Sequence, residues 1–173
     1  MNQEVLEPDL DIFMYAGRWY EIAKLPNPWE INCSQSTADY YVDDRPLQEG
    51  LSPEVDIINT CWDDQGEIID QKEARGWIPD PQYSGAIVVE FKNPSEKGWY
   101  LVHETDYLNY SIVGSPDRQY LWILSRTPTM CKNVFDQLLE FTEEIGYDID
   151  RIELDEDLLI ECPYKDTYTD IPR

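Results

Sequence analysis

The chain has 173 residues, which is long enough for one domain with a hydrophobic core, and no apolar run of about 18 residues or more that would predict a membrane span. Its 36 acidic and 13 basic side chains give a net charge of −23, which repels nucleic acid and anionic membrane surfaces. The acidic residues are spread along the whole length, so they indicate a solvated, self-repelling surface, with a basic protein partner as the alternative. We therefore expect neither nucleic-acid binding nor an integral membrane span.

Between residues 17 and 126 the sequence breaks into short β-type runs with turn residues between them. The predicted strands are 18–24, 36–42, 55–62, 67–77, 84–91, 99–104, 111–114 and 119–125. Each connection is typical of a hairpin, so neighbouring strands are expected to pair antiparallel. Eight such strands can close into a barrel, which removes exposed edges and leaves room for one small ligand.

After Arg126 the apolar residues change to helical spacing, from Val134 to Ile145, and Gly146 stands where a C-terminal cap belongs. Thr127 or Thr129 is the expected start of this amphipathic helix, whose apolar face should pack against the outside of the barrel. A last short strand is expected at 152–154 or 158–161.

Together these elements predict an all-β protein of one domain over residues 1–173. Its core is an eight-stranded antiparallel up-and-down β-barrel, and one C-terminal α-helix packs outside it. The barrel is expected over about 13–126, the helix over about 130–146 and a C-terminal segment over 147–173.

Three short motifs occur in one order along the chain. They are Gly17-Arg18-Trp19-Tyr20-Glu21-Ile22-Ala23, Thr105-Asp106-Tyr107 and Leu121-Trp122-Ile123-Leu124-Ser125-Arg126-Thr127-Pro128-Thr129. In this order they resemble the three signature blocks of the lipocalin family. The residues of these motifs are most similar to those of the subgroup that includes bacterial outer-membrane lipocalins, apolipoprotein D and the arthropod pigment carriers. The resemblance spans residues 9–163.

The resemblance implies a structural latch of Gly17, Trp19 and Arg126 at the closed end of the barrel. An indole presents a negative π-face, and a guanidinium can stack on that face while it remains hydrogen-bonded. Asp106 is expected in an adjoining turn, where its carboxylate can accept backbone hydrogen bonds.

A cup inside the barrel follows from strand alternation and from the resemblance. Arg126 and Trp122 share a parity, so Trp122 should face the barrel axis if Arg126 does. The resemblance adds positions on the second, third, fifth and sixth strands. The expected ligand-binding residues are Tyr40, Asn59, Phe91, Tyr100 and Trp122. Such an aromatic lining with few polar groups suits an apolar ligand with one polar end. The amide of Asn59 needs hydrogen bonds from a ligand, from water or from a neighbouring tyrosine.

The four cysteines fit either disulfides or buried thiols, and no CxxC spacing predicts a zinc site or a redox pair. The resemblance to pigment carriers implies a disulfide between Cys33 and Cys162. Bacterial-type relatives instead imply a bridge between Cys33 and Cys61. With the first pairing, which we favour, Cys61 and Cys131 remain as inert thiols.

The sequence predicts no cofactor, no metal site and no catalysis. His103 is the single histidine and is interpreted as a satisfied polar residue, and Cys61 is the one candidate nucleophile for an enzyme. The expected function is binding and transport or storage of a small hydrophobic ligand such as a lipid, fatty acid, sterol, retinoid or pigment. The alternative is an interaction protein that uses its acidic surface and has a vestigial or self-filled cup.

Location and assembly are predicted less narrowly. We expect a secreted or otherwise extracytoplasmic protein that is a monomer or a dimer. Residues 1–11 are acidic and lack the basic and apolar regions of a secretory signal, so a signal has been removed or none exists, and an intracellular location stays open.

Overall fold

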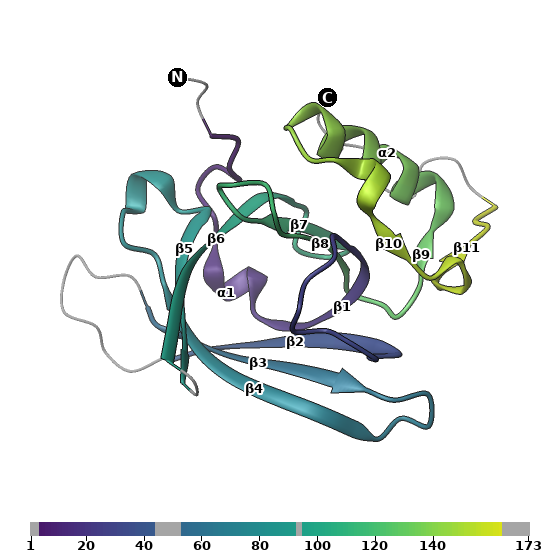
Figure 1. The fold of residues 1–173 in the computed structure, drawn as a ribbon. Coiled ribbons are helices and arrows are strands. Elements are labelled where there is room, and N and C mark those ends of the chain that lie inside the picture. Colours follow the sequence, from purple (N-terminus) through teal and green to yellow (C-terminus); the bar gives the residue numbers. More distant parts are fainter. Residues whose placement is uncertain (1–3, 44–52, 93–94, 164–173) are drawn as a thin grey trace.

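The strands of the protein curl into a closed barrel, seen in the computed structural model, which describes residues 4–43, 53–92 and 95–163 (Figure 1). The barrel strands are β1 (Gly17–Lys24), β2 (Gln35–Val42), β3 (Val55–Trp62), β4 (Ile68–Trp77), β5 (Ala86–Lys92), β6 (Ser95–Thr105), β7 (Tyr110–Gly114) and β8 (Leu121–Ser125). Each pairs antiparallel with the next, and β1 also pairs with β8, which closes the sheet. The predicted eight-stranded antiparallel barrel is confirmed.

The remaining elements are short, apart from one helix. They are the helices α1 (Ile12–Tyr15) and α2 (Lys132–Glu144), the 3₁₀ turns at Pro81–Tyr83, Ile149–Arg151 and Glu156–Leu158, and the strands β9 (Met130–Cys131), β10 (Glu153–Leu154) and β11 (Leu159–Ile160). β10 extends the sheet beside β1, and β11 pairs parallel with β9. Each of the two segments in which a last strand was expected therefore contains a short strand of its own.

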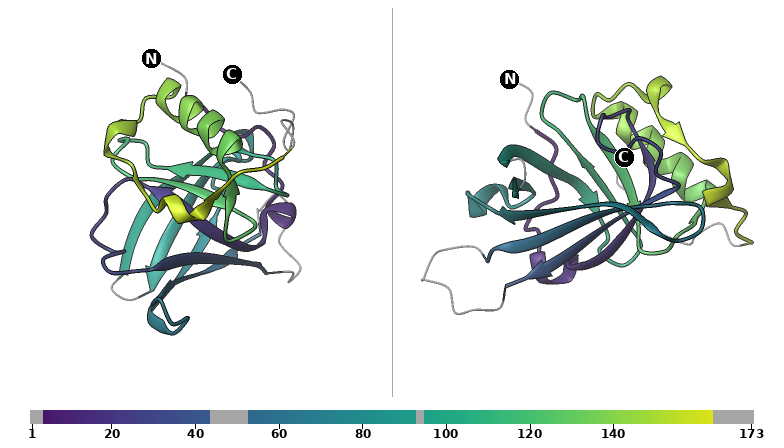
Figure 2. Two further views of the ribbon diagram at one scale, coloured as in Figure 1. Left: turned by 90° about the vertical axis from the view of Figure 1, so that its right-hand side faces the viewer. Right: turned by 60° about the horizontal axis from the view of Figure 1, so that its bottom comes forward.

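Helix α2 packs outside the barrel, beside β7, β8 and the end of β1 (Figure 2). Its buried side chains, among them Phe135 and Leu138, meet the outward faces of Ile112 and Ile123. The helix begins at Lys132 rather than at Thr127 or Thr129, because the chain first runs extended through β9 to pair with β11. It ends at Glu144, followed by Gly146 with a positive φ of 104°, as the cap signal predicted.

The barrel is closed at one end by Trp19, which is fully buried, and by α1, which the sequence did not predict. The guanidinium of Arg126 lies 3.7 Å from the centre of the Trp19 ring. Its three nitrogens donate to four backbone carbonyls, those of Tyr107, Arg18, Met14 and Tyr15, at 2.8 to 3.1 Å. The arrangement joins β1, β8, the β6–β7 turn and α1 through one side chain.

Gly17 begins β1 beside this guanidinium with a φ of +102°, a conformation that side chains other than glycine rarely adopt. A Cβ at this position would lie 3.2 Å from Nη1 of Arg126. In the adjoining turn Asp106 accepts hydrogen bonds from the backbone nitrogens of Asn109 and Tyr110, at 2.8 and 2.9 Å. These contacts fix the turn that carries the Tyr107 carbonyl toward Arg126.

All four cysteines form disulfides, and the pairing differs from the favoured one. Cys33 bonds to Cys61, and Cys131 bonds to Cys162. The predicted Cys33–Cys162 bridge is therefore wrong, and so is the interpretation of Cys61 and Cys131 as thiols. The reason is topological: Cys61 is opposite Ser36 in the β2–β3 register, close to Cys33, whereas the β9–β11 pair brings Cys162 to Cys131.

Candidate ligand-binding cup

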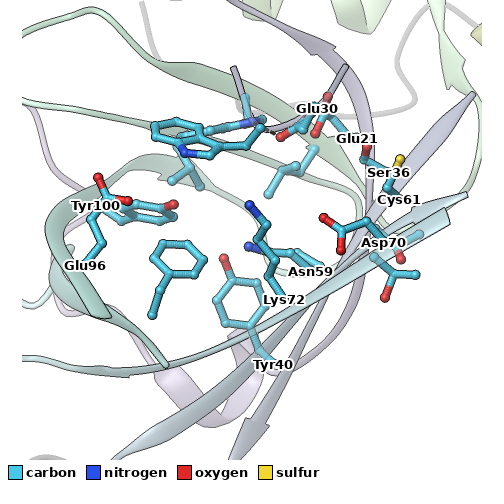
Figure 3. Close-up of a pocket in the computed structure, with 18 residues that line it drawn as sticks. Glu21, Glu30, Ser36, Tyr40, Asn59, Cys61, Asp70, Lys72, Glu96 and Tyr100 are labelled. Carbon is cyan, nitrogen blue, oxygen red and sulfur yellow. Dashed lines mark hydrogen bonds between the residues drawn. The ribbon is translucent and has the colours of Figure 1, made fainter. Parts of the chain in front are cut away.

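The barrel holds a cavity of about 240 Å³, whose lining side chains are drawn in Figure 3. All five residues that we expected at a ligand site line it, and they come from five strands. They are Tyr40, Asn59, Phe91, Tyr100 and Trp122. The chain thus brings together side chains that lie more than 80 residues apart in the sequence.

One wall of the cavity is aromatic. The rings of Tyr100 and Trp122 are stacked with centroids 5.5 Å apart, and Tyr120 follows at 6.3 Å from Trp122. Trp29, from the connection between β1 and β2, has its ring centroid 4.7 Å from that of Tyr120 and lines the cavity as well. Rings in this arrangement present a wide apolar surface with few polar atoms.

A second cavity, of about 310 Å³, adjoins the first at the mouth. The two share part of their lining, including Trp29, Phe91, Tyr100 and Trp122. The first cavity is slightly smaller than the sites of drug-sized ligands, which span about 300 to 1,000 Å³. A ligand longer than the first cavity could therefore extend past Trp122 into the second.

The opposite wall is polar. Tyr40, Asn59 and Lys72 project from β2, β3 and β4 into the cavity, and the Tyr40 side chain is buried. Burial raises the pKa of the Tyr40 hydroxyl to about 12, so the group is a neutral hydrogen-bond donor at ordinary pH. Lys72 was not among the expected residues, because β4 is polar on both faces around it and its alternation does not mark an inner side.

A pair of carboxyl groups, Glu21 and Glu30, lies beside Trp122. Glu30 accepts a hydrogen bond from Nε1 of Trp122 at 2.8 Å and another from Nζ of Lys24 at 3.1 Å. Burial, and then the charge of Glu30, raises the pKa of Glu21 well above its usual value. This environment favours the neutral form of Glu21, and the charge of Lys24, whose Nζ lies 3.9 Å from Glu21 Oε1, opposes the effect only in part.

Sequence reasoning missed this pair, although one signal was present. Glu21 follows Trp19 by two residues and so shares its inward direction. Nothing local indicated Glu30, because it lies in the irregular connection between β1 and β2. Only the folded chain brings that connection over the cup, where Lys24 also donates to the Glu30 carbonyl at 3.0 Å.

His103 takes no part in the cup. It is buried on the outer side of β6, where Nε2 lies 2.7 Å from the hydroxyl of Tyr147 and Nδ1 donates to the carbonyl of Val5. Across residues 4–43, 53–92 and 95–163, no three His, Cys, Asp or Glu side chains group as metal ligands. No helix of those same ranges is long and apolar enough to cross a membrane.

The closed barrel, its latch and the lined cup define a lipocalin, and comparison with known proteins agrees. Residues 10–157 match the family model described as a lipocalin-like domain. The chain is 33% identical over 146 residues to outer membrane lipoprotein Blc of Vibrio cholerae, covering 83% of this chain and 81% of that protein. It is 31% identical over 156 residues to temperature-induced lipocalin-1 of Arabidopsis thaliana, covering 83% and 77% of the two chains. This protein belongs to the lipocalin family.

Among solved structures, insecticyanin from the tobacco hornworm Manduca sexta superposes with a TM-score of 0.65 at 23% identity, covering 96% of this chain and 95% of that one. A likeness at this identity concerns the fold. Lipocalins typically bind small hydrophobic ligands and act in binding or transport rather than as enzymes.

Proposed function

We propose that this lipocalin binds a small hydrophobic ligand in its cup and carries or stores it, with Tyr40, Asn59, Phe91, Tyr100 and Trp122 in contact with the ligand. The observation that supports this most is the cavity of about 240 Å³ whose wall is formed by stacked aromatic rings. Apolar burial contributes about 25 cal/mol per Å², which is enough for micromolar binding even without specific contacts.

The first test identifies the natural ligand. Native mass spectrometry and organic extraction are applied to protein purified from its own source. A stoichiometric apolar molecule supports the carrier function and names the ligand. A protein that arrives empty and also does not bind the uncharged apolar dye N-phenyl-naphthylamine argues against it.

The second test assigns the site. Trp122→Ala is expected to weaken dye binding about tenfold, because it removes the ring that faces the cup. Trp77→Ala is the matched control, since Trp77 lines neither cavity and packs against Arg75 outside. Urea unfolding of both variants checks that the barrel persists. Equal dye affinity of Trp122→Ala and the unmodified protein would remove Trp122 from the site.

We propose that the protein does not catalyse a reaction. The candidate nucleophile, Cys61, is bonded to Cys33 and has no thiol to offer. Incubation of retinoid, sterol and fatty acid ligands with the protein, followed by chromatography, is expected to return them unchanged. A protein-dependent product would overturn this proposal.

We also propose that the protein is located outside the cytoplasm. Two disulfides persist in oxidising compartments and are rare in the cytosol. The similar protein of Vibrio cholerae carries the name of an outer membrane lipoprotein. Fractionation of the source cells would test the location, and recovery in the cytosol with reduced cysteines would contradict it.

The acidic surface supports one alternative function, an interaction with a basic protein partner. The net charge of −23 would steer such a partner and make its binding weaken with salt. That the protein itself is a monomer or a dimer stays a prediction, which sedimentation in about 0.15 M salt can test.

A further inference from the structure

Three hydrogen-bond donors from consecutive strands meet on one wall of the cup. Asn59 of β3 is directly opposite Lys72 of β4 in the strand register, and Tyr40 of β2 lies diagonally across from Asn59. Side chains opposite or diagonal to one another on one face of a sheet are within reach of each other. Figure 3 shows the Tyr40 hydroxyl, the Asn59 amide and the Lys72 ammonium turned into the same part of the cavity.

None of the three has a hydrogen-bond or ion-pair partner among the residues that the structure describes. Asn59 and Lys72 are half-buried, and no polar atom of the three is fully buried without a partner, so water reaches them while the cup is empty. A ligand that fills the cup displaces this water and leaves the donors to be satisfied by its own acceptors. A buried polar group without a hydrogen bond is costly, and proteins rarely leave one unpaired without a reason. The wall therefore presents donors that call for an acceptor from outside the chain.

Lys72 differs from the other lysines that the structure describes. Within the described ranges the ammonium groups of Lys24, Lys92, Lys97 and Lys132 each form an ion pair with a carboxylate. Lys72 forms none, in a chain with 36 acidic side chains. Its charge is directed into the cup instead, where an anion could pair with it.

The carboxyl groups of the cup do not occupy the same place. Glu30 is already bonded to Trp122 and Lys24, and Glu21 lies 3.9 Å from Nζ of the same lysine. Asp70 and Glu96 lie nearer the mouth, since Asp70 is two residues from Lys72 toward the open end of β4 and Glu96 is the second residue of β6, opposite Phe91. A head group that has passed the mouth thus meets the donors first.

We propose that Lys72, Tyr40 and Asn59 form a subsite for the anionic head group of an amphiphilic ligand, a carboxylate or a phosphate. The apolar part of the ligand lies against the facing wall of Phe91, Tyr100 and Trp122. An ammonium and two neutral donors on one anion form charge-assisted hydrogen bonds, which are stronger than neutral ones. This inference rests on the proposed function and specifies the class of ligand.

The test compares four ligands with one chain and different head groups: dodecanoate, dodecyl phosphate, dodecanol and dodecylammonium. Each is titrated calorimetrically, below its micelle concentration, into full-length protein freed of lipid by extraction. The variant Lys72→Met removes the charge and keeps an unbranched side chain that is shorter by one atom. Lys92→Met is the matched control, because Lys92 is an exposed strand lysine bonded to Glu73 and lines neither cavity.

Lys72→Met is expected to lose roughly tenfold in affinity for dodecanoate or dodecyl phosphate and to keep dodecanol within about twofold. Whichever anion binds more tightly to the unmodified protein identifies the carboxylate or the phosphate as the better head group. Lys92→Met is expected to leave all four affinities within about twofold. Tyr40→Phe, which removes only a hydroxyl, is expected to weaken anion binding about threefold, and it serves if Lys72→Met does not fold.

Two results would overturn the subsite: tighter binding of dodecylammonium than of both anions, or an unchanged ratio of dodecanoate to dodecanol affinity in Lys72→Met. In either case, measurable binding of dodecanol would still support the proposed carrier function. If none of the four ligands binds, the carrier function fails, and the subsite fails with it.

Discussion

His103 is expected to stay neutral until the pH falls to about 4, because burial lowers its pKa from 6.5 to about 4. The imidazole is 1% exposed, Nδ1 donates to the Val5 carbonyl, and Nε2 is left to accept from the Tyr147 hydroxyl. A second proton on the ring would make Nε2 the donor to the Tyr147 hydroxyl, which can donate to the Ser115 carbonyl at 3.3 Å. The cost is the positive charge that this proton places inside the protein.

The unfolded chain therefore takes up this proton at a higher pH than the folded protein does. The contribution of neutral His103 to the free energy of unfolding is complete above about pH 6.5 and is lost as the pH falls toward 4. The gap between the two pKa values corresponds to about 3 kcal/mol of unfolding free energy, at about 1.4 kcal/mol per pH unit. The loss should be complete just below the folded pKa.

The assay is direct because the chain has a single histidine. An NMR titration of its ring protons reports the folded pKa without mutation. Urea unfolding at about pH 7 and about pH 4 then compares the protein with His103→Asn, whose amide can still donate to the Val5 carbonyl. Carboxyl groups titrate in both proteins, so their effects cancel in the difference.

The stability advantage of the unmodified protein over His103→Asn is expected to shrink by about 3 kcal/mol between the two pH values. A measured histidine pKa of about 6 or above, or a difference that does not change with pH, would refute the reasoning.

Three further predictions concern stability and use urea unfolding. Replacing Cys131 and Cys162 together by serine should cost about 3 to 4 kcal/mol, because the bond joins residues 31 apart, and equal stability under oxidising conditions would show that the bond does not form. Gly17→Ala should cost about 2 kcal/mol, since alanine is strained at a φ of +102°, and a cost near zero would contradict the close approach to Arg126. Burial raises the pKa of Glu21, so stability falls as the pH rises from the usual glutamate pKa through the raised one. Glu21→Gln should flatten this part of the profile, and an unchanged slope would argue against the raised pKa.

The sequence predicted the lining residues of the cup better than it predicted its charged groups. Trp122 was predicted from the parity it shares with Arg126, whereas Tyr40, Asn59, Phe91 and Tyr100 were predicted from the resemblance to other lipocalins. Lys72 was not predicted because its strand is polar on both faces, so no apolar face indicated which side points inward. Glu30 was not predicted because an irregular connection has no hydrophobic periodicity that would indicate where its side chains point.

By itself the sequence determined the barrel, its eight strands, the outer helix and the positions of Gly17, Trp19 and Arg126, because these depend on local periodicity, turn residues and short motifs. Only the tertiary structure decided which cysteines meet, since pairing depends on the distance between Cα atoms and not on spacing along the chain. It also decided that Glu21 is buried beside Glu30, which raises the pKa of Glu21, and that Lys72 has no ion-pair partner among the described residues. Burial and proximity set the state of an ionisable group, and both arise only when separate strands close around one cavity.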